Sequence, residues 1–234
     1  MPASPFKRFL RRFGVEIKRT AYGLDPWLDL AALLAPAKEP TILDIGANLG
    51  QTTRQLAEIS PGARIWAFEP NGEIFPKLMQ NVAGLPRVTP VNAALGSAEA
   101  TASLKVTGAT VNSSLLDYDR PTGIDSVKKE LSVSVKTIDD FAEKENIARI
   151  DLLKTDTQGY DLHVLNGAAR MFQERRIQAV FAEVMFTRFY REQAEFHEIY
   201  SLLYGHGLRL SGFYNVARET GFDIDWADAL FVLP

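Results

Sequence analysis

The sequence contains no cysteine among its 234 residues. That absence excludes a disulfide framework, a Cys-based zinc site and a thiol nucleophile, and it fits a reducing compartment. The chain also has no apolar run of the about 20 residues that span a bilayer, and its first residues lack the apolar core of a secretory signal. We therefore expect a cytoplasmic protein, and the length suits one large domain.

Histidine is scarce, with only His163, His197 and His206 present. No two of them have the spacing of a metal-binding pair such as H-E-x-x-H. A divalent metal held by oxygen ligands is therefore possible but is not predicted.

Positive charge is scarce outside the N-terminus. Residues 1–20 carry six basic residues and one acid, a net charge of +5, in a chain whose net charge is −3, so the remainder carries −8. A body of that sign is a poor binder of nucleic acid, and no nucleic-acid partner is expected. Residues 1–36 are expected to be a basic, helical N-terminal segment. Its aromatic face either packs on the chain's own domain, which we favour, or makes peripheral membrane contact through residues 1–20.

Apolar runs that predict strands alternate with helical patterns along residues 37–234. This alternation is typical of an α/β domain with a mostly parallel seven-stranded sheet and helices on both faces. The predicted strands are 41–45, 64–68, 87–92, 150–155, 178–183, 208–213 and 228–233, and the predicted helices are 26–35, 51–59, 73–83, 137–146, 160–174 and 191–206.

A β-rich insertion is expected at about residues 96–136. Residues 100–106 and 131–135 both alternate with period two, which predicts an antiparallel pair. The polar stretch 107–126 between them either covers a substrate or is a surface decoration without contact to ligand. The residues alone leave both interpretations open.

The first predicted strand ends at an acid, Asp44, and a glycine-rich turn follows. Gly46 and Gly50 let a ligand approach the backbone closely. The second strand ends at Glu69, a carboxylate that can hold ribose hydroxyls. The turn is not a P-loop, because no Lys-Ser/Thr pair follows it, and Gln51 stands where a dinucleotide fingerprint has its third glycine.

The charge of Asp44 disfavours a pyrophosphate and favours a ligand with a cationic or amino-acid end. The turn therefore predicts S-adenosylmethionine rather than NAD or ATP. A nicotinamide-dependent oxidoreductase is an alternative that the missing third glycine argues against.

The chain resembles the FkbM family of S-adenosylmethionine-dependent methyltransferases. The resemblance implies a class I methyltransferase (Rossmann-like) sheet with an antiparallel strand near its edge. It also implies O-methylation of a hydroxyl on a sugar, polyketide or other natural product, so the expected partner is a small-molecule or glycan acceptor. The motifs that carry it are Asp44–Gly50, Phe68–Pro70, Asn92–Gly96, Asn112–Leu115, Leu153–Asp161 and Ala182–Val184.

The resemblance also implies cofactor-binding residues. The methionine and ribose end would be lined by residues of the first turn, the ribose hydroxyls would be bound by Glu69, and two residues past the third strand would lie near the adenine. The residues of the turn are Asp44, Gly46, Asn48 and Gly50, and the two near the adenine are Asn92 and Ala93.

Candidate catalytic residues follow the later strands. Asp156 and Glu183 end adjacent predicted strands, so their carboxylates are expected on one rim of one cleft, as a base, a substrate-orienting pair or a divalent metal site. The plainer interpretations are a helix cap for Asp156 and a paired buried carboxylate for Glu183. His163 is a third candidate base, although such a residue is more often an ordinary helix residue.

The family pattern usually has a glutamate at the position of Gln158. Glutamine can donate and accept hydrogen bonds but cannot serve as a base. A non-catalytic nucleoside-binding or interaction module on the same fold is therefore the alternative function.

Overall fold

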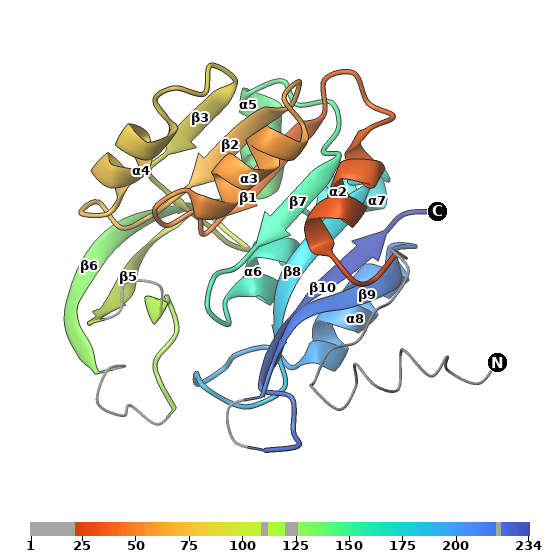
Figure 1. The fold of residues 1–234 in the computed structure, drawn as a ribbon. Helices are drawn as coiled ribbons and strands as arrows, with labels where there is room; N and C mark the ends of the chain where they lie inside the picture. The colour runs from red at the N-terminus through yellow and green to blue at the C-terminus, as the bar shows by residue number, and fades with distance from the viewer. Residues whose placement is uncertain (1–21, 109–111, 120–125, 219–220) are drawn as a thin grey trace, which may run out of the picture.

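The computed structural model describes residues 22–108, 112–119, 126–218 and 221–234. Its centre is a seven-stranded sheet in the order β3-β2-β1-β7-β8-β10-β9, with helices on both faces (Figure 1). The strands are β1 (Thr41–Ile45), β2 (Arg64–Phe68), β3 (Val88–Val91), β7 (Leu152–Thr155), β8 (Ala179–Met185), β9 (Arg209–Ala217) and β10 (Trp226–Val232). The helices are α2 (Pro26–Leu34), α3 (Gln51–Ile59), α4 (Phe75–Val82), α5 (Ile138–Lys144), α6 (Asp161–Asn166), α7 (Ala169–Gln173) and α8 (Phe196–Gly205).

Five strands form the parallel body of the sheet. β3, β2, β1, β7 and β8 pair in parallel, while β10 runs antiparallel to both β8 and β9. Parallel strands covered on both faces are apolar along their whole length, and every residue of β8 is accordingly buried. The predicted fold class, including the antiparallel strand near the edge, is confirmed.

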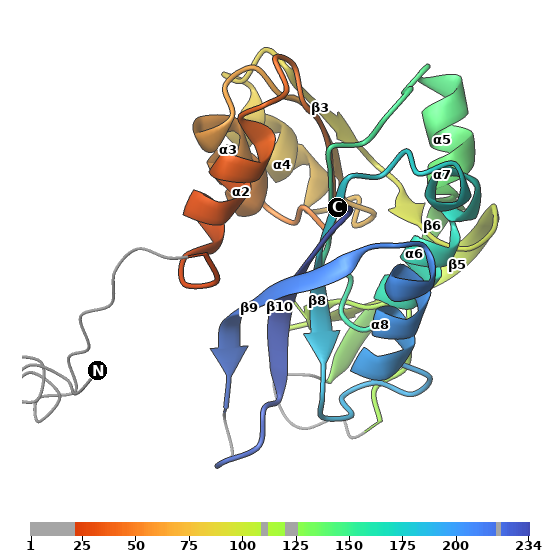
Figure 2. The same cartoon turned by 90° about the vertical axis from the view of Figure 1, so that its right-hand side faces the viewer.

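Alternate residues of each strand feed two cores on opposite faces of the sheet. Ile42 and Ile65 pack with α2 and α3, whereas Leu43 and Trp66 pack with α5, α6, α7 and α8. Figure 2 shows the two layers, with α2, α3 and α4 on one side of the strands and α5, α6, α7 and α8 on the other.

The expected β-rich insertion forms a second sheet of three strands. β4 (Ala94–Leu95), β6 (Val127–Lys136) and β5 (Ala100–Thr107) lie in the order β4-β6-β5. β5 and β6 pair antiparallel, as their period-two pattern predicts, with Ala100 opposite Val135.

Two predicted helices differ from the structure by more than a shift of one or two residues at their ends. The predicted helix 160–174 is interrupted at Gly167 and forms two short helices, α6 and α7. The interruption occurs because the chain packs closely against Gly96 at this point, where a Cβ on residue 167 would lie 2.1 Å from the Gly96 carbonyl oxygen. The predicted helix 191–206 begins only at Phe196, after the Glu195 amide, which donates to the Glu198 carboxylate at 2.8 Å. This is the return bond of a capping box, which marks a helix start.

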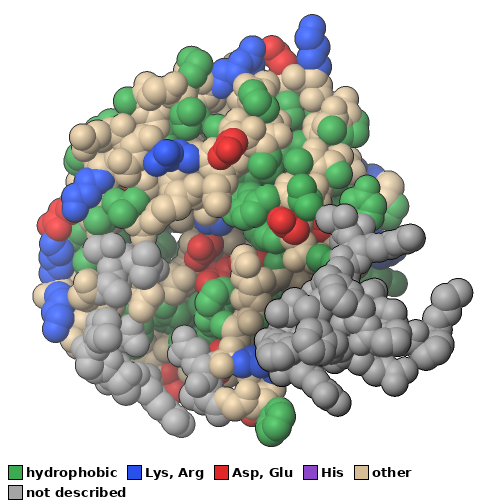
Figure 3. Space-filling view, viewed as in Figure 1, with side chains coloured by type: hydrophobic (Ala, Val, Ile, Leu, Met, Phe, Trp, Pro, Cys, Tyr) green, Lys and Arg blue, Asp and Glu red, His purple; other side chains and the backbone are tan. Residues whose placement is uncertain are grey.

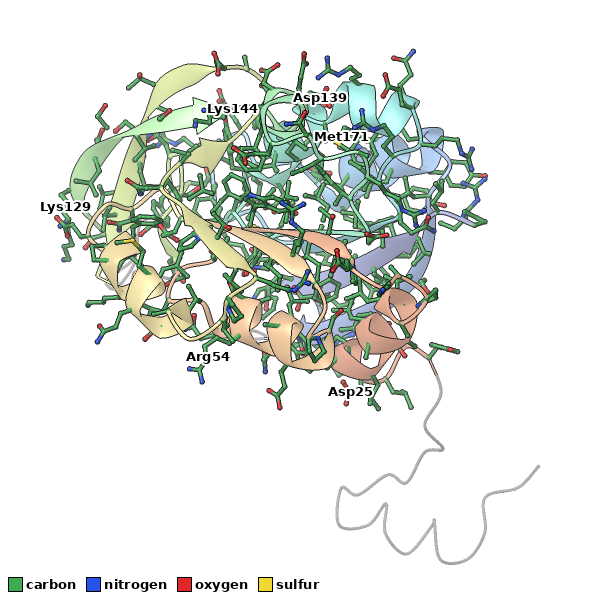
Figure 4. The ribbon with its side chains drawn as sticks, turned by 90° about the horizontal axis from the view of Figure 1, so that it is seen from above. Asp25, Arg54, Lys129, Asp139, Lys144 and Met171 are labelled. Atoms are coloured by element: carbon green, nitrogen blue, oxygen red, sulfur yellow. The ribbon has the colours of Figure 1, made fainter. Side chains whose placement is uncertain are left out.

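Short helices are tied together by side-chain to backbone hydrogen bonds. The Asp139 carboxylate of α5 accepts from the backbone amides of Arg170 and Met171 at 2.8 and 3.0 Å. Figure 4 shows Asp139 and Met171 next to each other near the top of the view. These bonds satisfy amides of the first turn of α7, which no bond within that helix can satisfy.

α2 belongs to the main core, with Leu30 and Leu34 buried against the sheet. The Tyr214 hydroxyl donates to the Asp29 carboxylate at 2.6 Å, joining α2 to β9. Residues 1–21 lie outside the described residues, and so does the membrane contact predicted for residues 1–20. Within the described part of the chain, no helix has the length and apolarity to cross a membrane. The cytoplasmic location stays a prediction.

Candidate active site

A cavity of about 300 Å³ opens at the carboxyl ends of β1, β2 and β7. Open parallel sheets bind ligands at this edge. In Figure 3 acidic side chains gather in a recess near the middle of the face that Figure 1 also shows. The cavity wall combines the turn after β1, the loop after β2, the start of the inserted sheet and the loop after β7.

The turn after β1 needs its glycines. Gly46 has φ +81° and lies so close to the loop after β7 that a Cβ would fall 1.9 Å from the Asp156 carbonyl oxygen. Gly50 has φ +85° and lies against the side chains of α4. Gly46 and Asn48 line the cavity, whereas Gly50 closes the turn behind it as the residue preceding α3.

Glu69 lies on the cavity wall and is held by two backbone amides. Its Oε2 accepts from the Asn48 amide at 2.9 Å, and its Oε1 accepts from the Asn71 amide at 2.7 Å. Burial raises the pKa of Glu69, while these two bonds and the charge of Lys154 oppose the rise. Each carboxylate oxygen keeps capacity for one further hydrogen bond, as two ribose hydroxyls would require.

The two residues predicted near the adenine lie past β3. Ala93 lines the cavity, together with the apolar side chains of Phe68 and Leu95. Asn92 does not line it; its side-chain amide donates to the Glu69 and Pro70 carbonyls at 2.8 and 3.2 Å, which fastens the two loops together.

Asp44 lies beneath the cavity and not on its wall. Its side chain is fully buried, accepts from the Thr53 hydroxyl at 2.5 Å and lies 3.2 Å from Lys154 Nζ. The ion pair balances the charge of Asp44, so this acid by itself does not select the charge of a ligand. The expectation that Asp44 lines the methionine and ribose end takes no account of this pairing, which holds the side chain beneath the cavity.

Lys154 also reaches Asp156, with Nζ 3.6 Å from Oδ2. Burial alone would lower the pKa of Lys154, but the carboxylates of Asp44 and Asp156 outweigh it and raise the pKa. Lys154 is therefore a fixed cation at the cavity floor. In the sequence, Lys154 is a single lysine within an apolar strand, and a buried lysine implies a buried carboxylate partner.

Asp156 and Glu183 are brought together through a third side chain. The Gln158 amide nitrogen lies 3.1 Å from Asp156 Oδ1 and 3.1 Å from Glu183 Oε2. Asp156 lines the cavity with its side chain 39% exposed, whereas Glu183 is buried behind it. Burial, followed by the charges of Asp156, Asp161 and Asp228, raises the pKa of Glu183 well above its ordinary value.

The three histidines all lie within the described residues, and none of them lines this cavity. His163 stacks on the Tyr160 ring at 4.4 Å, and only Tyr160 reaches the wall. His197 pairs with Glu195 at 3.3 Å on the surface, and His206 stacks on Phe172 at 5.2 Å. His163 is thus not placed to take a proton from a group in the cavity.

The loop between β5 and β6 contributes to the wall through Asn112, Ser113 and Leu115. The neighbouring Ser114 hydroxyl donates to the Gln158 carbonyl at 2.7 Å. This part of the insertion therefore covers the cavity and is not a decoration remote from it.

The Methyltransferase FkbM domain matches this chain over residues 44–211. Among curated relatives, the hexuronic acid methyltransferase AglP of Haloferax volcanii is 30% identical over 145 residues, covering 60% of this chain and 55% of AglP. The 2-O-methyltransferase NoeI of Sinorhizobium fredii is 24% identical over 206 residues, covering 83% of each chain. Methyltransferase 1 of Beauveria bassiana is 32% identical over 146 residues, covering 54% of this chain and 57% of that protein. The chain spans little more than half the length of AglP and of Methyltransferase 1.

Solved structures support the fold. A fibrillarin/Nop5p complex matches with a TM-score of 0.51 at 16% identity, covering 89% of this chain and 83% of that chain. The METTL16 methyltransferase domain matches with a TM-score of 0.51 at 14% identity, covering 97% of this chain and 77% of that domain. The family match argues against the nicotinamide-dependent alternative: the chain belongs to the FkbM family of S-adenosylmethionine-dependent methyltransferases.

Proposed function

We propose that the chain transfers the methyl group of S-adenosylmethionine to a hydroxyl oxygen of a sugar or a related polar natural product. The observation that carries the proposal is the Asp156 carboxylate, which is partly exposed in the same cavity as Glu69. One cavity thus offers a cofactor carboxylate and a second carboxylate for the acceptor.

The residues of the first turn fit the cofactor. Gly46 lets the ligand approach the backbone, and Glu69 would hold the ribose hydroxyls with the lone pairs that its two amide bonds leave. Asn48 Oδ1 is buried and has no hydrogen-bond partner within the described residues, so it can accept from an ammonium or hydroxyl group. Phe68, Ala93 and Leu95 form an apolar wall for the adenine.

Asp44 and Asn92 support this end without lining it. Asp44 holds Lys154 and the first turn of α3 through Thr53. Asn92 links the loops after β2 and β3.

When bound, the cofactor supplies an activated methyl group, so the protein mainly orients the acceptor oxygen and handles its proton. Asp156 is placed to accept the hydroxyl proton. Lys154 remains protonated and lies 3.6 Å from Asp156 at the cavity floor, where it helps to hold that side chain. Glu183 acts behind Asp156 and does not reach the cavity itself.

The acceptor end is polar, with Asn112, Ser113, Thr157, Gln158 and Tyr160 on its wall. Such side chains suit the hydroxyls of a sugar. The relatives AglP, a hexuronic acid methyltransferase, and NoeI, a 2-O-methyltransferase, support the same class of acceptor.

The test combines binding with turnover. We expect the demethylated cofactor to bind with a dissociation constant on the order of micromolar by calorimetry. We expect labelled methyl transfer to at least one member of a panel of neutral glycosides, amino sugars and hexuronates, and mass spectrometry should find the methyl group on oxygen. Methyl groups found only on nitrogen or carbon would contradict O-methylation. Binding without turnover on broad panels would favour a non-catalytic nucleoside-binding module.

A further inference from the structure

Gln158 lies between two carboxylates and donates to both. Its amide nitrogen is 3.1 Å from an oxygen of Asp156 and 3.1 Å from an oxygen of Glu183. An amide nitrogen carries two hydrogens, one for each acceptor. The reverse orientation would place the amide oxygen against two carboxylates, so the carboxylates themselves determine which way the amide points.

The other end of the amide is also held. The Tyr190 hydroxyl donates to Gln158 Oε1 at 2.8 Å, and Tyr190 is 3% exposed. The side chain of Gln158 is therefore engaged at its oxygen and at its nitrogen, and it joins β7, β8 and the segment before α8.

The backbone is bent to place this side chain. Gln158 has φ +56° and Gly159 has φ +87°, so two consecutive residues occupy the left-handed region. A glutamine adopts that region rarely, and such residues concentrate at functional sites. Ser114 fixes the bend from the inserted loop by donating to the Gln158 carbonyl at 2.7 Å.

Two adjacent carboxylates require a proton, a cation or a hydrogen-bond donor between them. Lys154 reaches Asp156 but is shared with Asp44 on the far side. Three of the charged groups that surround Glu183 are acids, namely Asp156, Asp161 and Asp228, and Lys154 is the one opposing charge among the groups identified. The Gln158 amide fills the position between Glu183 and Asp156.

We propose that Gln158 is a positioning residue whose amide takes the place of a cation between Asp156 and Glu183, and so holds the Asp156 carboxylate aimed into the cavity. The assignment rests on the proposed function, in which Asp156 accepts the proton of the acceptor hydroxyl. It predicts that a carboxylate at position 158 would leave three acidic side chains around one point, a set of hard oxygen ligands for a divalent cation.

The experiment compares the native chain with Gln158→Glu and Gln158→Leu, each first checked for binding of the demethylated cofactor. Calorimetry with Mn²⁺ alone should show no binding to the native chain or to Q158L, and a dissociation constant of about 10⁻⁴ M for Q158E. Methyl transfer by Q158E should fall at least tenfold in the presence of chelator and recover at least fivefold with Mn²⁺. Q158L should lose at least tenfold in kcat, and Mn²⁺ should not restore it.

A Q158E variant that binds the demethylated cofactor but no Mn²⁺ would overturn the proposal. A native chain that binds Mn²⁺ at this point, or a Q158L variant with the native kcat, would overturn it as well. If the native chain methylates no acceptor while Q158E gains Mn²⁺ binding, the proposed function fails and the role of the amide as a cation substitute stands.

Discussion

Glu69 is fixed before any ligand arrives. Its two oxygens accept from backbone amides on two different loops, one following β1 and one following β2. Because the side chain is ordered in advance, little conformational entropy would be lost if it accepted the ribose hydroxyls of the proposed cofactor. The same bonds make the carboxylate part of the loop structure.

We predict that Glu69→Ala weakens binding of the demethylated cofactor at least about 30-fold. The reason is that hydrogen bonds to a charged group contribute about 1.5 to 3 kcal/mol each. Calorimetry would measure the change. Glu73→Ala is the control, since Glu73 lies on the same loop, is 58% exposed and pairs with Lys129 on the surface. Equal affinity of the native and E69A chains would show that the ribose assignment is wrong.

A second prediction concerns Asp156. Replacement by asparagine keeps a hydrogen-bonding side chain but removes the base, so Asp156→Asn should lower kcat by about 10² to 10⁴. Affinity for the demethylated cofactor should change less than threefold. The surface variant Glu174→Gln, which loses only an exposed ion pair with Arg176, should leave both quantities unchanged. A D156N variant with native kcat would remove Asp156 from the mechanism.

At the scale of elements, the site depends on the close approach of β1 and β7. Ile45 pairs with Thr155, so the turn after β1 and the loop after β7 leave the sheet next to each other. Gly46 is the contact point, where the Asp156 carbonyl occupies the space of a side chain. The glycine therefore serves the packing of the two loops, and its backbone also lines the cavity.

We predict that Gly46→Ala costs at least about 2 kcal/mol in the free energy of unfolding, because it combines a positive φ with overpacking against backbone. Urea unfolding would measure it. Gly84→Ala is the matched control, since a Cβ there meets nothing within 4 Å. We expect the G84A change to stay within about 0.5 kcal/mol. A similarly small loss in G46A would show that the two loops separate readily.

The fold of the sheet brings together acidic residues that are far apart in the sequence. Asp228 pairs in register with Glu183 across β10 and β8, and Asp156 follows β7 next to them. Burial raises the pKa of Asp228 to about 6, with the charge of Asp156 adding to it and the Asn215 hydrogen bond opposing it. Burial likewise raises the pKa of Asp161 to about 6.

These pKa shifts change the free energy of unfolding with pH in a defined direction. A carboxyl group whose pKa is higher in the folded state than its ordinary 3.8 holds its proton more tightly when folded. Its contribution to stability is complete below about pH 4 and is lost as the pH rises through about 6.

We therefore predict that Asp228→Asn is more stable than the native chain at pH 8, by up to about 3 kcal/mol, and that the difference falls to less than half of that value at pH 4.5. The asparagine side-chain oxygen can still accept from Asn215, which donates to Asp228 at 2.6 Å. Urea unfolding at the two pH values would measure the difference. A constant gap between pH 4.5 and pH 8 would contradict the assignment.

Local pattern was sufficient for most elements. Strand β1 and helix α3 have the predicted bounds, because an apolar run and an amphipathic period are both local properties. The break at Gly167 was not predictable in the same way. It depends on the Gly96 carbonyl, some 70 residues away along the chain, which the period of a helix does not contain.

The residues of the candidate site fall into the same two groups, those that local sequence predicts and those that depend on distant parts of the chain. The glycine turn, Glu69 and Asp156 could be found from the sequence, because each follows a strand and strand ends meet at one edge of a parallel sheet. Lys154 lies within one of the family motifs, but the sequence alone gives it no role, and the candidate His163 lies outside the cavity wall. Whether a side chain next to a strand end faces the cavity depends on neighbours that only the folded chain supplies.

The fold class, the family and the cofactor could be inferred from the sequence alone, because strand periodicity and short motifs are properties of consecutive residues. The positions of the acids could not: Asp44 lies beneath the cavity with Lys154, Asp156 faces the cavity, and Glu183 lies behind Asp156 and is joined to it by Gln158. Burial and pairing arise between elements that are distant in the chain, so they become visible only in the folded protein.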